Sequence, residues 1–128
     1  IAPKTSAHAC VDDDSIVQCV PWERIAWHAP GCNKQGIGIE HAGWARQTPQ
    51  QWRDDYSRRM LQRSAWLVAR LCSQFDIPIG FVDAAGLLRN EAGITTHIEV
   101  NHAFRKSDHT DPGVSFPMAD YLQLVRSA

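Results

Sequence analysis

The side chains best suited to chemistry gather in two short segments towards the end of the chain. His97 lies in "GITTHIEVN", and "HTDPG" places His109 two residues before Asp111. Neutral imidazole nitrogens and carboxylate oxygens are ligands that Zn²⁺ accepts, and a catalytic zinc site leaves one position open for water. Pro112 and Gly113 form a rigid turn that can fix the preceding carboxylate. On spacing alone, a metal site and an ordinary polar turn both remain open.

Glu40 is a second candidate for chemistry. It lies between Ile39 and His41 in the otherwise apolar segment "QGIGIEHAG". A buried carboxylate is costly unless it is paired, bound to a metal or functional. The alternative is simple alternation along a strand, which would place Glu40 on a solvent-exposed face.

Trp27 and Trp44 flank the Glu40 segment in sequence and could line a groove for sugars or peptides. The chain has no GxSxG, P-loop, GxGxxG or HExxH motif, so the usual signatures of serine, phosphate and zincin chemistry are missing. Nothing in the sequence pairs a particular cysteine with a particular histidine as a nucleophile and base.

Composition and net charge limit the kinds of molecule that the protein is expected to bind. The chain has 128 residues, 44% of them hydrophobic and 21% charged, which is the size and composition of one soluble domain. A formal net charge of -1 gives no electrostatic case for nucleic acid or an anionic membrane, and no apolar run approaches the roughly 18 residues of a membrane span. We expect synthesis in a reducing cytoplasm, with mostly buried free thiols; a disulfide between Cys10 and Cys19 is the alternative.

Strands are predicted first along the chain and helices later. "AHACV" and "SIVQCV" flank "DDD", which predicts a β-hairpin, and residues 35–43 predict a third strand. Thr48-Pro49-Gln50-Gln51 is typical of a helix start with a capping box, and apolar residues at 3/4 spacing predict one long helix from there to about Phe75. We place His97 on a short helix or turn and expect a last helix from Pro117. This order predicts an α/β (α+β) fold with a central mixed sheet flanked by helices.

Four segments occur together in an order typical of one family. They are "SAHACVDDDSIVQCVP", "IAWHAPGCNKQGIGIE", "GITTHIEV" and "HTDPGVSFPMADYL". From Ser6 to about Leu124 the sequence resembles the zinc-dependent N-acetylmuramoyl-L-alanine amidases, the superfamily that includes bacteriophage endolysins and peptidoglycan recognition proteins. The resemblance implies a single catalytic domain over residues 1–128 that acts on the bacterial cell wall.

The family pattern assigns roles to the residues singled out above. By resemblance, His97 and Asp111 are zinc ligands, and Glu40 matches the carboxylate that activates the zinc-bound water. His109 stands where the family commonly has a lysine or threonine that steadies the oxyanion. The implied reaction is hydrolysis of the amide between N-acetylmuramic acid and L-alanine of the stem peptide.

Three further residues are implied in substrate binding. His28 and Asn33 match positions that line the family's substrate groove, and Trp27 lies directly before His28. The implied partner is therefore peptidoglycan, a muramyl peptide, rather than nucleic acid or membrane.

One departure from the family pattern bears on the metal site. The family's first zinc ligand is a histidine in a "VxHHTA"-like strand ahead of the "SAH" strand, and no such motif precedes His8. We expect that this strand is missing from the given chain; otherwise the site is incomplete, or it closes with His8 or His28. An incomplete site would favour a non-catalytic peptidoglycan-binding module, and a third possibility is an α/β domain whose His–Asp motif is structural.

Overall fold

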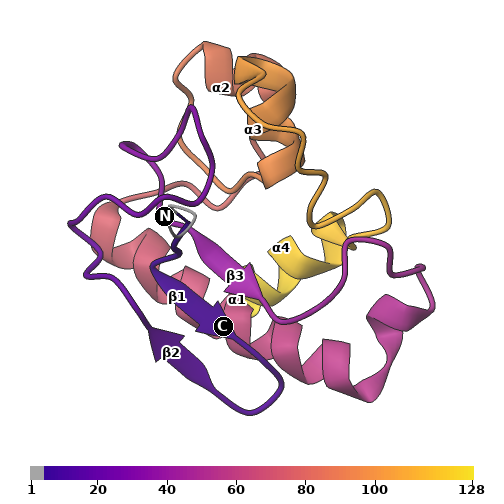
Figure 1. Cartoon of the computed structure of the whole chain (residues 1–128). Coiled ribbons are helices and arrows are strands. Elements are labelled where there is room, and N and C mark those ends of the chain that lie inside the picture. Colours follow the sequence, from indigo (N-terminus) through magenta and orange to yellow (C-terminus); the bar gives the residue numbers. More distant parts are fainter. Residues whose placement is uncertain (1–4) are drawn as a thin grey trace.

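The computed structural model describes residues 5–128 and has a small sheet with helices packed around it (Figure 1). The described elements, in chain order, are β1 (Ala9–Val11), β2 (Ile16–Gln18), β3 (Ile39–His41), the 3₁₀ helix η1 (Gln51–Arg53), α1 (Asp55–Phe75), α2 (Ala84–Leu88), α3 (His97–Phe104) and α4 (Met118–Ser127). The α+β class and the order of strands before helices are confirmed.

The sheet has the order β2-β1-β3 and is mixed, as predicted. β1 and β2 form the expected antiparallel hairpin, and β1 pairs with β3 in parallel. Asp12 closes the hairpin turn because its Oδ1 accepts hydrogen bonds from the backbone N–H groups of Asp14 and Ser15, at 3.0 and 2.7 Å. The aspartate run is therefore a turn, as its composition indicated.

The third strand is shorter than predicted, since only Ile39–His41 of residues 35–43 pair with a neighbour. Register places Glu40 beside Cys10, on the face of the sheet opposite α1. Val11 and His41 are paired on the opposite face, which packs against α1. The sheet is thus covered on one face, and Glu40 lies on the other.

The predicted long helix is divided in two. Thr48 and Gln51 do form the capping box, with reciprocal hydrogen bonds of 2.9 and 3.2 Å, but it starts only the short η1. Asp54 then breaks the helix with extended backbone and caps α1, its carboxylate accepting from Ser57 N–H at 2.7 Å. Asp54 is itself a preferred N-cap residue, so a second start signal lay inside the predicted helix.

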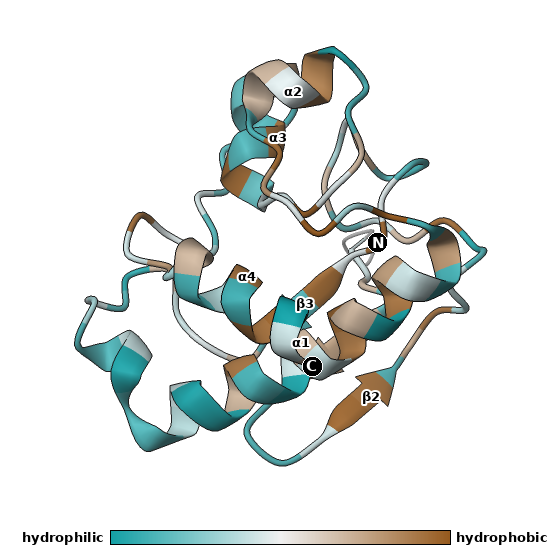
Figure 2. Ribbon diagram, turned by 180° about the vertical axis from the view of Figure 1, so that it is seen from behind, coloured by the Kyte–Doolittle hydropathy of each residue, from teal (hydrophilic) through white to brown (hydrophobic). Residues whose placement is uncertain are grey.

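The core lies between α1, α4 and the covered face of the sheet. Figure 2 views the molecule from behind and shows hydrophilic residues interleaved with hydrophobic ones along α1. A buried polar chain joins the three elements: His41 Nε2 lies 2.6 Å from Ser64 Oγ, which lies 2.7 Å from Tyr121 Oη. Hydrogen bonding to one another satisfies these groups in the apolar interior.

α2 and α3 pack on each other at the end of the molecule farther from α1 (Figure 1). All four cysteines are free thiols, but Cys10 and Cys19 are exposed, so the expectation of mostly buried thiols is wrong for these two. Both come from the hairpin whose outer face the helices leave open. Within residues 5–128, no helix combines the length and the hydrophobicity needed to cross a bilayer.

Candidate metal centre

His97 is placed by the start of α3. Thr96 is the N-cap, and its hydroxyl accepts a hydrogen bond from Glu99 N–H at 3.4 Å. His97 is therefore the first residue of the helix, as the sequence indicated for a short helix or turn. Its side chain is only 12% exposed, which limits the orientations that the ring can take.

His97, His109 and Asp111 bring their donor atoms together, all within 4.8 Å of one another. The Nδ1 atoms of His97 and His109 lie 3.2 and 3.6 Å from the same oxygen, Oδ1 of Asp111. The two imidazole rings are stacked, with centroids 4.7 Å and planes 9° apart. Among residues 5–128, the other grouping of this kind is the acidic hairpin turn, residues 12–14. Two imidazoles and a carboxylate are the donor set of a catalytic zinc site.

The turn that carries Asp111 is closely constrained. Gly113 N–H donates to the Thr110 carbonyl at 2.9 Å, and the peptide bond between Asp111 and Pro112 is cis, as in a type VI turn. Gly113 has φ +93°, and a Cβ there would lie 1.8 Å from the carbonyl oxygen of Ala45. Only glycine fits this approach, so the "DPG" sequence fixes the turn against the loop after β3.

Two hydrogen bonds attach this segment to α3. The backbone N–H of Ile98, free at the helix N-terminus, donates to the Asp111 carbonyl at 3.1 Å. The side-chain amide of Asn101 donates to the carbonyl of His109. Residues on both sides of Thr110 are thereby held against the helix that carries His97.

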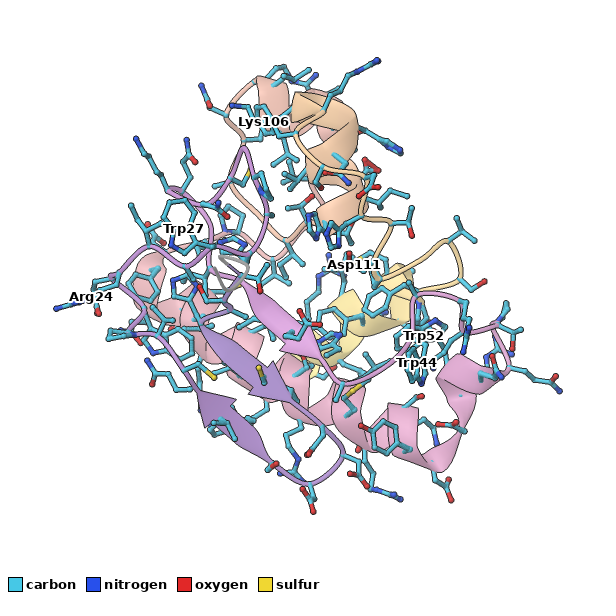
Figure 3. The ribbon with its side chains drawn as sticks, viewed as in Figure 1. Arg24, Trp27, Trp44, Trp52, Lys106 and Asp111 are labelled. Carbon is cyan, nitrogen blue, oxygen red and sulfur yellow. The ribbon has the colours of Figure 1, made fainter. Side chains whose placement is uncertain are left out.

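Glu40 faces this cluster from the open side of β3. Partial burial raises the pKa of its carboxyl group, and the negative charge of Asp111 raises it further, while the two histidines of the cluster oppose the rise. Figure 3 shows Asp111 in the region between α3 and β3. The sequence left open that Glu40 lies on a solvent-exposed face of the strand, and Glu40 is indeed exposed. That exposed face is, however, the one next to the His97, His109 and Asp111 cluster.

His8 and His28, the alternative third ligands, both form hydrogen bonds to backbone groups outside the cluster. Both ring nitrogens of the buried His8 are used: Nδ1 accepts from Gly38 N–H at 3.0 Å, and Nε2 donates to the Arg24 carbonyl at 2.7 Å. His28 Nε2 lies 3.1 Å from the Gly36 carbonyl oxygen. Neither belongs to the cluster of donor atoms, so within residues 5–128 the third donor beside His97 and Asp111 is His109.

The predicted substrate-binding residues lie in the loop before β3. Asn33 Oδ1 accepts from the backbone N–H groups of His28 and Ala29, at 2.9 and 2.7 Å, so this side chain shapes the loop. Burial lowers the pKa of His28, and the neighbouring His97 contributes to that lowering. Trp27 is 53% exposed and lies on the other side of β3 from Trp44 (Figure 3), so the two tryptophans do not form one wall.

Two residues of the site were missed in the sequence. Asn101 and Ser107 are hydrogen bonded to each other and contact His97 and His109. The available signal was weak: Asn101 is a polar residue one helical turn after His97, on the same face of α3.

The fold and the donor set define an α+β domain with a candidate His–His–Asp metal centre. A family model described as N-acetylmuramoyl-L-alanine amidase matches residues 2–114. The chain therefore belongs to the N-acetylmuramoyl-L-alanine amidase family, as the resemblance of the four segments indicated.

Two curated relatives carry the same family name. The chain is 37% identical over 87 residues to N-acetylmuramoyl-L-alanine amidase CwlA of a Bacillus species, a match that covers 61% of this chain and 31% of that protein. It is 29% identical over 133 residues to N-acetylmuramoyl-L-alanine amidase A of Achromobacter lyticus, covering 95% and 69%. The chain thus spans about a third of the length of the Bacillus relative.

Solved structures agree on the fold. The hydrolase AmiA of Staphylococcus aureus, determined with its ligand, superimposes with a TM-score of 0.72 at 21% identity, covering 94% of this chain and 55% of that one. PlyL superimposes with a TM-score of 0.57 at 19% identity, covering 94% and 65%. At these identities the likeness extends to the arrangement of the chain and no further.

Proposed function

We propose that this domain is a zinc-dependent N-acetylmuramoyl-L-alanine amidase that hydrolyses the amide between N-acetylmuramic acid and L-alanine in peptidoglycan. The observation that carries the proposal is the carboxylate of Glu40 facing a cluster of two imidazoles and a carboxylate. Membership of the amidase family supports the choice of substrate. The place of action is the cell wall, and a bacteriolytic, endolysin-like role is part of the proposal.

The chemistry of the donor set fits zinc. His97 Nδ1 and Asp111 Oδ1 face each other as two zinc ligands, and the more exposed His109 lies beside them, with its Nδ1 3.6 Å from the same carboxylate oxygen. Zinc, when bound there, would polarise the scissile carbonyl and make a water molecule more acidic.

The residues of the chain supply the proton transfers. Glu40, which faces the cluster, accepts the proton of the attacking water as the general base. His109, with its side chain 60% exposed, donates to the oxyanion that forms on the carbonyl carbon. Glu40 then returns the proton to the amine of L-alanine as the amide bond breaks.

Space for substrate exists on the outer side of His109. An open pocket of about 500 Å³ lies between α3 and residues 105–110, and His109 is one of its walls. Trp27, to the left of Asp111 in Figure 3, presents an exposed aromatic surface, which suits the apolar faces of sugars and side chains.

Glu40→Gln separates catalysis from binding. The amide keeps the size of the side chain but accepts no proton, so hydrolysis of purified peptidoglycan should fall by about 10²- to 10⁴-fold. Zinc content and sedimentation with insoluble peptidoglycan should stay at the wild-type level. Full hydrolysis in Glu40→Gln would remove Glu40 from the mechanism. A wild-type protein that sediments with peptidoglycan and hydrolyses none of it would instead be a binding module.

A further inference from the structure

A chain of side-chain hydrogen bonds lies behind His97, on the side away from Asp111. His97 Nε2 is 3.4 Å from Ser107 Oγ, and the hydroxyl of Ser107 donates to Asn101 Oδ1. The Nδ2 atom of Asn101 donates to the backbone carbonyl of His109. Asn101 is 8% exposed, so its amide depends on these protein partners rather than on solvent.

One group that can only accept determines which atom donates in each of these hydrogen bonds. A backbone carbonyl only accepts, so the NH₂ group of Asn101 must face His109 and its oxygen must face Ser107. The hydroxyl proton of Ser107 is used in that second bond. Towards His97, Ser107 therefore offers only lone pairs, which require a proton on Nε2.

We propose that Ser107 and Asn101 are positioning residues that hold His97 as the Nε2–H tautomer and so keep the lone pair of Nδ1 free for a metal ion. A histidine ligand commonly donates its second N–H to a partner that fixes the ring, and Ser107 takes that place here. The metal ion itself rests on the proposed function, whereas the tautomer is a property of the protein alone.

Asp111 favours the other tautomer of His97, with the proton on Nδ1. Its Oδ1 lies 3.2 Å from Nδ1 and, without a metal ion, would accept a proton placed there. The Ser107 bond opposes that arrangement. Loss of the Ser107 hydroxyl should therefore transfer the proton from Nε2 to Nδ1, and zinc would then have to displace it.

The test is the ¹⁵N spectrum of the histidine rings in metal-free protein at about pH 8, where an ordinary imidazole is neutral. We expect the Nε2–H form for His97 in the wild type and in Ser107→Thr, which keeps the hydroxyl. Ser107→Ala should show the Nδ1–H form. Asn101→Ala should also show the Nδ1–H form of His97, because the freed Ser107 hydroxyl can then donate to Nε2. Ser73→Ala, on the exposed surface of α1, is the matched control and should leave the spectrum unchanged.

Zinc affinity provides the second measurement. Ser107→Ala should weaken zinc binding by about tenfold, with recovery in Ser107→Thr. An Nδ1–H form in the wild type, an unchanged tautomer in Ser107→Ala, or unchanged zinc affinity despite a changed tautomer would each overturn the proposal. If these shifts occur in a protein that hydrolyses no peptidoglycan, the proposed function fails and the positioning role stands.

Discussion

Asp111 is the residue on which the proposed metal centre most depends. Its Oδ1 is the one atom close to both histidine rings of the cluster. In Asp111→Ala we expect zinc affinity to fall by more than the roughly 10- to 100-fold that loss of an outer-shell partner costs. Competition with a chromogenic chelator measures it, with Asp108→Ala, on the same loop, as the control. Equal affinities in the two variants would show that Asp111 is not a ligand.

His109 has two possible roles, as a zinc ligand or as the hydrogen-bond donor to the oxyanion. Its side chain is the most exposed of the three, which suits a group that meets the substrate. His109→Ala should keep zinc and lose about 10²- to 10³-fold in kcat, the usual effect of removing one oxyanion donor. Zinc content and kcat on purified peptidoglycan, measured on the same preparation, test this. A loss of zinc as large as that in Asp111→Ala would make His109 the third ligand instead.

Some site residues could be predicted from their chemical type and others could not. His97, Asp111 and Glu40 were singled out by their chemical type, and the family resemblance then assigned them roles, which stay a proposal. Asn101 and Ser107 were not singled out, since their partners depend on how residues 105–110 fold back over α3. A sequence motif records which groups carry chemistry more readily than which groups orient them.

At the scale of elements, β3 connects the site to the core. Glu40 faces the cluster, while the next residue, His41, packs beside Ser64, Tyr121 and Phe116 on the opposite face. Alternation along a strand places adjacent residues on opposite faces, so the packing of His41 sets the direction of Glu40. The strand itself was predicted, but its length was not, because pairing depends on the partner strand.

Burial of His41 predicts a pH dependence of stability. Burial lowers its pKa to about 4, from an ordinary value of 6.5. Between these values the unfolded chain binds a proton that the folded protein does not, so the free energy of unfolding falls as pH falls, by up to about 3 kcal/mol. Urea unfolding at about pH 7 and pH 4.5 measures this effect.

His41→Gln should show a clearly smaller loss of stability over that pH range. The control is His102→Gln, whose side chain is 62% exposed and which should behave as the wild type does. If all three proteins lose the same stability on acidification, His41 is not the group responsible.

Helix boundaries show where local signals compete. The capping box at Thr48 and Gln51 is present, yet Asp54 captures Ser57 N–H and starts α1 afresh. Both are good start signals, and the sequence does not rank them. The last predicted helix contains no second start signal of this kind, and its predicted start at Pro117 agrees with the structure.

At the scale of the whole molecule, the covered face of the sheet supplies stability and the open face supplies the site. α1 and α4 pack behind the strands, and α3 with the 109–113 turn brings the donor cluster towards Glu40 (Figures 1 and 3). The family was predicted from motifs along the chain and the fold class from the order of its elements, and both are confirmed; the same motifs indicated the residues of the candidate site. The assembly of the site could not be predicted, because α3 and β3 are far apart in sequence.

The most direct measurement is the identity of the chemical group released from purified peptidoglycan by the zinc-loaded protein. We predict new amino termini that are L-alanine, with no new reducing sugar ends, and their disappearance in Glu40→Gln. New reducing ends, amino termini of another residue, or no release by a protein that retains zinc would contradict the account.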